Sequence, residues 1–565
     1  MIRKDVKMYK SGLKTHIRVV EGYRENGKVK QRTIKSFGFL EDQPNKDEFM
    51  QKVKEFDDNF SLSKKAKKDS YTRLFNECDF NKPVNYGYKF LESIYNSLKL
   101  EEYFNNQYSK ADYDLNEIFK YLVIQRILNP DSKRSTFFKK DNYYNLSCDF
   151  ELADIYRALT KFDDLKIDMQ KYLNDRVKEN IGRNGEYAYY DVTNYYFEID
   201  TPDADGLRQR GVSKEHRVDP IVQMGLFIDE NALPISMSLF KGNTADTKTL
   251  QPVMKEIKQN YNLKRLIVVA DKGLNSNLNI NYIINNNDGY VVSQILKGKK
   301  GKRYQDRLFD DSLYTYNQNR TFKYQEFIED YEIINKDGIK ETKKRKVLIY
   351  WKYEDAILEA KKRDDKLGRA LNSLKNNAYA IKHTYEQYIK EIHSVIDTGE
   401  IADKVARGID EEKVALDAKY DGYFCIITSE IDYDYNKILE VYSSLWRIEE
   451  SFRITKNDLD VRPVYVSTES HINGHFIICF VALLIIRLLQ YKMNYSLSVE
   501  RIVRALNTSN CLIEENGSIH ILQNTINKEE TIEDYIKILE AYKVNIPFER
   551  YKENNFERYL DNIAY

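Results

Sequence analysis

Cysteine is scarce in this 565-residue chain, and its arrangement argues against two kinds of scaffold. The five cysteines are scattered, with no CxxC pair: Cys78, Cys148, Cys425, Cys479 and Cys511. Structural zinc sites need closely spaced thiolates, and small secreted scaffolds need many paired cysteines. The sequence therefore predicts a protein of a reducing cytoplasm that lacks structural zinc and disulfides.

Long apolar runs are also few. The longest, residues 476–489, is shorter than the ~20 residues needed to cross a bilayer, and Arg487 interrupts it. The N-terminal segment MIRKDVKMYK has no apolar core of the signal-peptide type. We therefore expect no membrane association, and we interpret the apolar run as a buried core helix.

Net charge is nearly absent, at +1 for the whole chain, so the overall composition does not indicate a nucleic-acid partner. The distribution of charge is more informative. Residues 1–40 carry eleven Lys/Arg against three Asp/Glu, and residues 297–307 carry six Lys/Arg against one Asp. Such clusters can neutralise phosphates locally, although a solvated surface is an equally simple interpretation of each one.

The chain is long enough for two to four domains. Residues 16–24 and 28–36 flank Glu25-Asn26-Gly27, a strong hairpin signal. Residues 41–68 are polar and indicate a linker or an exposed helix. From about 84 to 180 the apolar spacing is helical, with a helix that ends at Asn129-Pro130 and two further helices over 151–180.

After Glu186 the pattern changes to short apolar strands. Three strands in sequence are followed by alternating helices and strands, which predicts an α/β fold with a mixed sheet of the ribonuclease-H-like kind. Residues 297–420 interrupt this pattern with a hairpin, a strand and a long charged helix over 354–393, so we interpret them as an insertion. The core resumes with a strand over 422–428, a helix over about 435–456 and an apolar helix over 473–491.

Two aspartates and one glutamate are the candidate catalytic residues. Asp191 and Asp271 lie in or just after apolar strands, although a lone aspartate there usually only caps a turn. In YSSLWRIEESFRITK, Tyr442, Glu449 and Lys456 are spaced by seven residues, which returns each to within about 20° of the same helical face. From spacing alone, an amphipathic helix with Glu449 and Lys456 on its solvent-exposed face is the favoured explanation of this row.

The row also suits phosphodiester cleavage. Carboxylates are ligands for Mg²⁺ or Mn²⁺, and two such ions about 3.5–4 Å apart can activate a water and stabilise a leaving oxygen. Tyr442 and Lys456 could then bind the phosphates on either side of Glu449.

These segments resemble a known family. YSSLWRIEESFRITK resembles the Tyr-x2-Arg-x3-Glu-x6-Lys signature of bacterial DDE-type insertion-sequence transposases that cut DNA through a hairpin intermediate. YYDVTNYYFE and VVADKGL look like the first and second aspartate motifs of that group, and RGVSKEHRVD, LFKGNTADTKTL and RPVYVSTESHINGHFIICFVALLIIRLL also resemble family segments. The resemblance implies that Asp191, Asp271 and Glu449 are catalytic and hold two Mg²⁺ or Mn²⁺ ions, with a β-strand-rich insertion between Asp271 and Glu449.

One position departs from the signature, because its arginine falls on Leu445. Arg453 lies about 40° from the face of Glu449 and could replace it, whereas Arg447 points about 200° away. Trp351 and Trp446 are the only tryptophans; related transposases hold a flipped base on an aromatic side chain, for which Trp351 is the better candidate, although core packing is the simpler role for both. The other predicted DNA-binding residues are the basic run of the insertion: Lys299, Lys300, Lys302 and Arg303.

The resemblance implies a cut-and-paste DNA transposase that acts as a homodimer on terminal inverted repeats and target DNA in the bacterial cytoplasm. Two alternatives remain: a ribonuclease-H-like nuclease without strand transfer, and a decayed transposase that only binds DNA and represses. The expected segments are a basic β-hairpin region and linker (1–68), a helical DNA-binding region (69–180), the first part of a ribonuclease-H-like catalytic core (181–296), an insertion domain (297–420), the second part of the core (421–495) and a helical C-terminal region (496–565).

Overall fold

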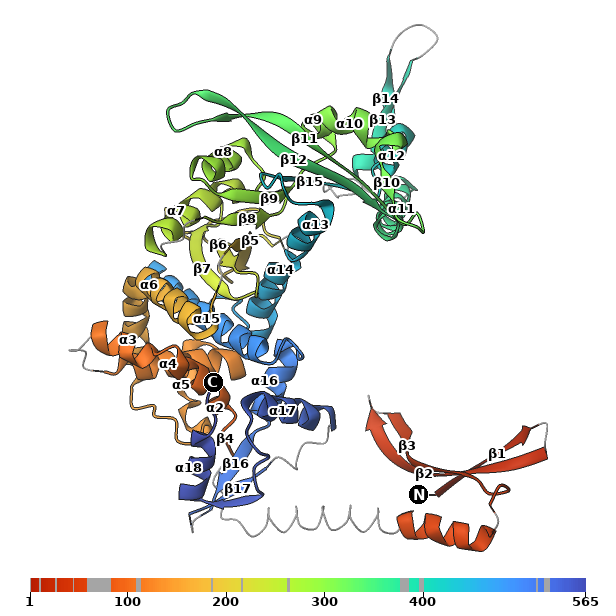
Figure 1. Ribbon diagram of the computed structural model, residues 1–565, viewed down its shortest axis with the longest axis vertical. Helices are drawn as coiled ribbons and strands as arrows, with labels where there is room; N and C mark the ends of the chain where they lie inside the picture. Colours follow the sequence, from red (N-terminus) through yellow and green to blue (C-terminus); the bar gives the residue numbers. More distant parts are fainter. Residues whose placement is uncertain are drawn as a thin grey trace. The chain divides into compact units, whose positions relative to one another are not determined.

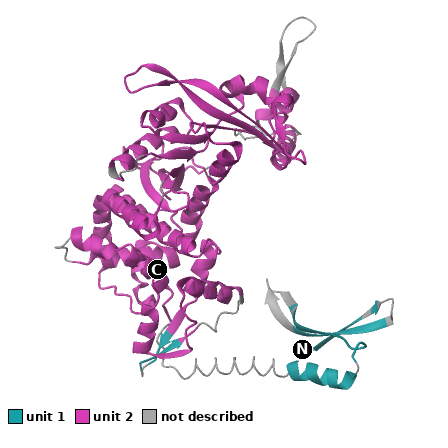
Figure 2. Cartoon of the chain, viewed as in Figure 1, with its two compact units in different colours: residues 1–82, 512–520 teal, residues 83–511, 521–565 magenta. Residues whose placement is uncertain are grey.

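The structure is a computed structural model, and its described residues form two compact units. It describes residues 2–9, 12–25, 28–43, 45–57, 83–107, 113–183, 186–214, 217–261, 265–375, 386–395, 401–514, 517–522 and 529–565. One unit comprises residues 1–82 and 512–520, and the other comprises residues 83–511 and 521–565 (Figure 2).

The N-terminal part of the first unit is a three-stranded antiparallel sheet that packs against a helix over residues 46–57. The strands are β1 (Ile2–Tyr9), β2 (Gly12–Glu25) and β3 (Lys28–Phe39). The predicted hairpin is confirmed by the antiparallel pairing of β2 with β3, while Asn26, Gly27 and residues 58–68 lie outside the described residues. Strand β1 was not predicted. Ile17, Val19 and Val53 form the buried centre of this part.

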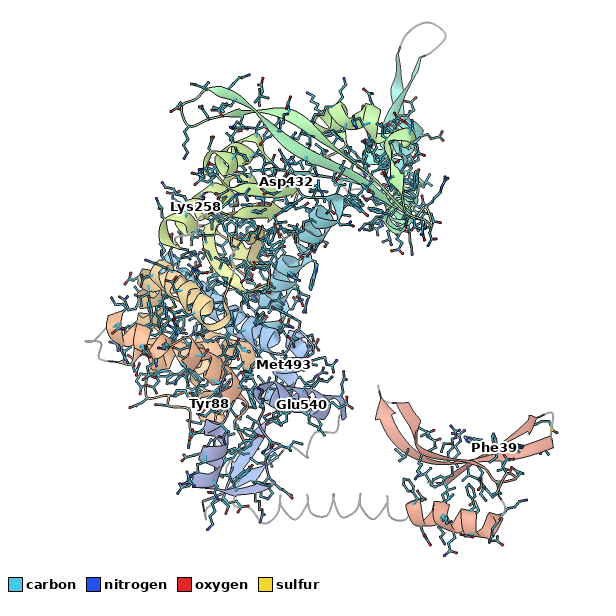
Figure 3. All side chains as sticks on the ribbon, in the orientation of Figure 1. Phe39, Tyr88, Lys258, Asp432, Met493 and Glu540 are labelled. Carbon is cyan, nitrogen blue, oxygen red and sulfur yellow. The ribbon has the colours of Figure 1, made fainter. Side chains whose placement is uncertain are left out.

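Residues 83–183 are helical, as predicted. They comprise β4 (Val84–Asn85), α2 (Tyr88–Ser97), α3 (Leu100–Gln107), α4 (Leu115–Leu128), α5 (Lys133–Phe137), η1 (Lys140–Asn142) and α6 (Leu152–Ile181). Helix α4 ends before Asn129, as expected. The prediction of two helices over 151–180 was wrong, because α6 is one 30-residue helix. Tyr88, labelled in Figure 3, donates a hydrogen bond to the carbonyl of Tyr144 at 2.7 Å and ties this region together.

A nine-stranded sheet lies at the centre of the second unit, in the order β10-β11-β12-β15-β9-β8-β5-β6-β7 (Figure 1). Its strands are β5 (Tyr187–Tyr196), β6 (Ile221–Ile228), β7 (Pro234–Lys241), β8 (Ile267–Ala270), β9 (Gly289–Ser293), β10 (Thr315–Tyr316), β11 (Phe322–Ile334), β12 (Lys340–Lys352) and β15 (Tyr423–Thr428). β5, β6 and β7 form an antiparallel meander, and β8 and β9 run parallel to β5. The predicted strand sequence of this part is therefore confirmed.

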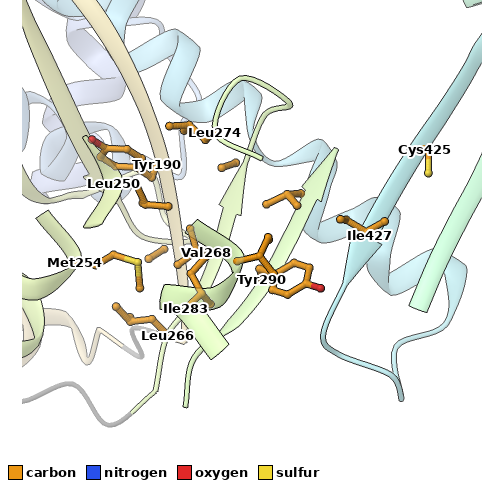
Figure 4. Packing of buried hydrophobic residues seen from close by; sticks show 14 of the residues in the cluster. Tyr190, Leu250, Met254, Leu266, Val268, Leu274, Ile283, Tyr290, Cys425 and Ile427 are labelled. Atoms are coloured by element: carbon orange, nitrogen blue, oxygen red, sulfur yellow. The ribbon is translucent and has the colours of Figure 1, made fainter. Parts of the chain in front are cut away.

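Strand β5 is buried on both faces, which explains its nearly continuous apolar and aromatic sequence. Ala188, Tyr190 and Val192 point to a core shared with helices α7 (Leu250–Asn260) and α8 (Asn277–Asn285), and η2 (Asp246–Lys248) precedes α7 (Figure 4). The alternate residues of β5 face the helices that follow β15.

The segment 297–420 contributes β10, β11 and β12 to the same sheet. Its other elements are α9 (Gly298–Gly301), η3 (Lys302–Tyr304), α10 (Gln305–Leu308), η4 (Asp311–Leu313), α11 (Tyr353–Lys375), η5 (Glu386–Tyr388), β13 (Ile389–Val395), β14 (Ile401–Ile409) and α12 (Glu411–Ala418). β11 and β12 form the predicted hairpin. The helix predicted over 354–393 is too long, because residues 389–393 belong to strand β13.

Helices α13 (Tyr435–Ser443), α14 (Trp446–Arg453) and α15 (Glu469–Lys492) follow β15, with the π-helical segment η6 (Ile454–Asp458) between α14 and α15. Among the described residues, α15 is the one helix long and apolar enough to cross a membrane, and it is buried inside the structure, as predicted for a core helix.

The C-terminal region contains helices, as predicted, together with short strands that were not predicted. It comprises α16 (Val499–Asn507), β16 (Asn510–Ile513), β17 (Ser518–Ile521), α17 (Glu529–Tyr542), β18 (Arg550–Lys552) and α18 (Glu553–Asp561).

Candidate active site

Two central parallel strands bring Asp191 and Asp271 to the same level of the sheet. Tyr187, Ala188 and Tyr189 of β5 pair with Ile267, Val268 and Val269 of β8. Asp191 lies two residues after Tyr189, still within β5, and Asp271 lies two residues after Val269, directly after β8. Neighbouring strands lie about 4.8 Å apart, so this register makes the two aspartates neighbours.

Asp271 is fixed by contacts with two other elements. Its Oδ1 accepts a hydrogen bond from the Ser293 hydroxyl at 2.9 Å, at the end of β9. The same oxygen lies 3.4 Å from the hydroxyl of Tyr442 on α13. Tyr442 therefore reaches the second aspartate directly.

The helix predicted over about 435–456 is interrupted, which corrects the picture of one uniform α-helix. α13 ends at Ser443, and the turn before α14 tightens, with the amide of Leu445 donating to the carbonyl of Tyr442 at 3.0 Å. After Arg453 the helix widens to π geometry, in which the amide of Leu459 donates to the carbonyl of Ile454 at 2.8 Å. Such π segments hold one extra residue per turn and are frequent at functional sites.

A buried arginine holds the end of this π segment. Arg126 of α4 donates from Nη1 to the carbonyls of Leu459 and Asp460 at 3.3 and 3.2 Å. Asp460 adopts a φ of +44°, a conformation that is strained for a non-glycine residue. The helical region therefore stabilises the irregular backbone that follows Lys456.

One cavity of about 650 Å³ brings the three predicted acidic residues together. Its lining residues are Asp191, Lys214, Asp246, Asp271, Gly273, Leu274, Glu449, Phe452, Arg453, Lys456, Asn457 and Arg462. Glu449 is exposed on α14, and Asp191 on β5 keeps 27% of its side-chain surface exposed. The interrupted helix thus still turns Glu449 and Lys456 toward the same space, and Tyr442 joins them through Asp271.

Four polar lining residues were missed by the sequence analysis: Lys214, Asp246, Asn457 and Arg462. Lys214 Nζ lies 4.0 Å from Asp191 Oδ2 and also donates to the carbonyl of Val192. Lys214 and Asp246 lie in the segments RGVSKEHRVD and LFKGNTADTKTL, whose family resemblance was a usable signal. Their position beside Asp191 depends on loop packing, which no periodicity encodes.

The electrostatics of the cavity show a concentration of negative charge around Asp191. Burial, with added repulsion from Asp246 and Asp271, raises the pKa of Asp191 to about 6 although Lys214 opposes the shift. Burial and Lys214 together lower the pKa of Lys456 to about 8, against the attraction of Asp191. Burial raises the pKa of Tyr442 to about 12, so its phenol is neutral at pH 7.

The two candidate arginines differ in position. Arg453 lines the cavity, with 44% of its side chain exposed and Nη1 3.3 Å from Asp458 Oδ2. Arg447 is not among the lining residues. Its positive charge instead acts to lower the pKa values of Tyr189 and Tyr495, against the larger effect of their burial. Leu445, at the position of the missing arginine, is buried.

A second cavity, of about 770 Å³, shares Asp271 with the first and is also lined by Tyr442. It extends between β9, β15 and α11, and its lining includes Lys272, Lys362 and Tyr423. Trp351 lies near it on β12, where its Nε1 donates to the carbonyl of Asp421 at 3.0 Å, and it is partly buried.

Trp446 begins α14 and is 55% exposed. Among the described residues it is thus the more accessible of the two tryptophans, and it lies within one helical turn of Glu449.

The basic run of the insertion is accessible. Lys299 and Lys300 lie on α9, and Lys302 and Arg303 lie on η3, all with exposed side chains. Arg303 also contacts Glu329 at 3.4 Å.

The donor chemistry of the cavity suits a hard divalent cation, because carboxylate oxygens face it and the pKa of Asp191 is raised by burial and like charges. Within the described part of the chain, no three acidic, histidine or cysteine side chains lie close enough to hold one ion together.

Comparison with known families agrees with this geometry. Residues 199–485, half of the chain, match the family described as the transposase DDE domain, and the chain belongs to this family. Residues 2–61 match the N-terminal domain of IS1634 family transposases, so the protein is an insertion-sequence transposase. The first match contains Asp271 and Glu449 and begins just after Asp191. Members of the DDE family generally use divalent metal ions. The search of curated proteins found no match to the chain.

Proposed function

We propose that this transposase cuts the ends of its insertion sequence and joins them to target DNA at the cavity lined by Asp191, Asp271 and Glu449. The observation that carries the proposal is the presence of these three carboxylates, with Lys456 and Arg453, around one cavity in a chain of the DDE family. The core is ribonuclease-H-like in this proposal, since an antiparallel meander is followed by two helix-connected parallel strands.

Together, the three carboxylates would hold two Mg²⁺ or Mn²⁺ ions. When bound, the ions would activate the attacking oxygen and stabilise the charge of the leaving one. The protein supplies the alignment. Lys456 and Arg453 bind phosphates beside the scissile bond. Tyr442, which is neutral at pH 7, donates a hydrogen bond from its hydroxyl to a DNA phosphate oxygen.

Each chemical step exchanges one phosphorus–oxygen bond for another. In the first step a water oxygen attacks a phosphate at the element's end, and the 3′-oxygen leaves as a hydroxyl. That hydroxyl attacks the opposite strand and closes a hairpin, water reopens the hairpin, and the freed 3′-hydroxyl attacks target DNA. No step needs an external energy source. The protein accelerates each step by positioning the reacting groups and by stabilising the charge that develops in the transition state.

The accessible basic and aromatic residues support an extended DNA contact. Lys299, Lys300, Lys302 and Arg303 can bind backbone phosphates. The second cavity, with Trp351 beside it and Trp446 near Glu449, offers surfaces on which an extruded base can stack.

We also propose that the N-terminal unit recognises the element's terminal inverted repeats and that two copies act together in the bacterial cytoplasm. Residues 1–40 carry a net charge of +8, and strand β1 exposes Arg3 and Lys4 to solvent. The match of residues 2–61 to a transposase N-terminal domain supports the assignment.

The test uses purified full-length protein and duplexes from the two ends of the element that carries the gene. Asp191→Asn, Asp271→Asn and Glu449→Gln should each abolish cleavage with Mg²⁺ or Mn²⁺ while end binding without divalent ions persists. Asp205→Asn is the matched control, because Asp205 is 95% exposed and lines neither cavity. Cleavage by any of the three site variants at the parental rate would refute the site.

Product analysis separates the proposal from its alternatives. Hairpin ends on denaturing gels and joined target products support transposition. Nicked ends alone would indicate a nuclease, and end binding without any cleavage would indicate a DNA-binding repressor.

A further inference from the structure

The apolar helix α15 buries one charged side chain, that of Arg487. Its exposed fraction is 0%, and it lies among Ile486, Leu488 and other buried apolar residues. Burying an ionised group is costly unless it is paired and hydrogen-bonded. The contacts of Arg487 should therefore identify what this charge is for.

Three of its four recorded hydrogen bonds go to α14, the helix that carries Glu449. Nη1 donates to Glu450 Oε2 at 2.9 Å, and Nη2 donates to Ser451 Oγ at 2.9 Å and to the carbonyl of Arg447 at 3.2 Å. The fourth goes to Gln490 Oε1 on α15 itself, at 2.9 Å. One guanidinium thus holds α14 at three points along one side.

Helix α14 needs such support, because little within it fixes its position. It has eight residues, begins after a tight turn at Leu445 without a side-chain cap, and runs into the π segment at Ile454. Isolated helices of this length are unstable, so tertiary contacts must set its height and rotation. Ser451 is fully buried against Arg487, while Glu449 is exposed to the cavity on the other side.

We propose that Arg487, through its ion pair with Glu450, is a positioning residue that sets where Glu449 stands in the metal site. This inference rests on the proposed function of Glu449. Arg487 does not line the cavity, and it acts through the backbone and side chains of α14.

A positioning role differs from simple stabilisation in what it predicts. Arg487 is fully buried, while the side chain of Glu450 is 25% exposed. Replacing both with apolar residues removes the desolvation cost of the buried arginine together with its partner, so the double variant should lose little stability. Fold stability and metal affinity should therefore separate in a double variant. Residues that orient metal ligands typically change metal affinity by about 10–100-fold when they are replaced.

The chain offers a matched control pair. Arg183 and Asp229 form a buried ion pair at 2.7 Å, with side chains 4% and 0% exposed, and they line neither cavity. Arg183→Met therefore removes a buried arginine from the same unit without touching α14.

The experiment compares full-length Arg487→Met, Glu450→Gln, the double variant Arg487→Met/Glu450→Met and Arg183→Met. It measures the Mn²⁺ concentration that half-saturates cleavage of an end duplex, and the rise in Tm caused by Mn²⁺ without DNA. We expect Arg487→Met and the double variant to need about tenfold more Mn²⁺ and to show a smaller Tm rise. Glu450→Gln, which keeps the fold and weakens the ion pair, should shift the same way by less. Arg183→Met should lower Tm without changing the Mn²⁺ requirement.

An unchanged Mn²⁺ requirement in Glu450→Gln and the double variant would overturn the inference, even if Arg487→Met failed to fold. A shift in Arg183→Met equal to that in Arg487→Met would also overturn it, because general destabilisation would then explain both. Full cleavage by Glu449→Gln would instead refute the proposed function. Inactive Glu449→Gln with a normal Mn²⁺ requirement in the Arg487 and Glu450 variants would refute only this inference.

Discussion

Arg453 is expected to take the role of the arginine that Leu445 replaces, and Arg447 is expected to be dispensable for DNA contact. The perturbations are Arg453→Ala and Arg447→Ala. Arg453 lines the active-site cavity, whereas Arg447 lies outside its lining. Only the carbonyl of Arg447 bonds Arg487, so alanine at that position leaves the contact with α14 in place.

The size of the effect follows from the exposure of Arg453. A hydrogen bond to a charged group contributes about 1.5–3 kcal/mol. Because 44% of the Arg453 side chain is exposed and it also pairs with Asp458 at 3.3 Å, the lower end applies. About 1.5 kcal/mol corresponds to a roughly tenfold loss in kcat/KM.

The assay is cleavage of an end duplex at low substrate, repeated over a range of salt concentrations. Arg453→Ala should lower kcat/KM about tenfold and reduce the salt slope of binding by about one. Arg447→Ala should keep both near parental values. An inactive Arg447→Ala beside a nearly normal Arg453→Ala would refute the assignment, although Glu449 would keep its proposed role.

Three further predictions concern charge. Lys456 is protonated below its pKa of about 8, so kcat/KM should fall as the pH rises through that value. Lys456→Arg should remove this fall, because arginine stays charged. A pH profile in Lys456→Arg identical to the parental one would contradict the phosphate-binding role of Lys456. Deletion of residues 1–82 should abolish end-specific binding in gel shifts while cleavage of nonspecific DNA persists, and unchanged end affinity would refute the recognition role. Lys133 faces Arg126, His475 and Cys479, and burial lowers its pKa from 10.5 to about 7. Between pH 7 and 10.5 the unfolded chain therefore binds one more proton than the folded protein, so the free energy of unfolding should rise with pH in this range. In urea unfolding, Lys133→Met should flatten the rise of the unfolding free energy with pH. An unchanged dependence on pH in this variant would contradict the assignment of the rise to Lys133.

The sequence predicted those parts of the site that depend on local pattern. Asp191, Asp271 and Glu449 became candidates because the segments around them resemble family motifs. The strand signals before the two aspartates and the seven-residue spacing around Glu449 agree with that choice but would not have made it alone. The tight turn at Leu445 and the π segment at Ile454 were not predictable, since contacts from Arg126 and other distant residues stabilise them.

The structure also changes how recognition should be tested. Deleting both segments that the sequence assigned to DNA binding, residues 1–180, would remove α4 and nearly all of α6. These helices pack against the buried helix α15, so the deletion would disturb the catalytic unit. A deletion of residues 1–82 removes only the N-terminal part of the first unit and keeps α4 and α6 in place.

The central claim is that Asp191, Asp271 and Glu449 together hold the divalent ions that support DNA cleavage. The most direct measurement is anomalous diffraction from crystals of the full-length protein with an end duplex and Mn²⁺. The account predicts Mn²⁺ peaks at coordination distance from Asp191 and Asp271, with Glu449 completing the shell of one ion. Mn²⁺ bound away from these carboxylates, or a shell without Glu449 in crystals that contain cleaved DNA, would contradict it.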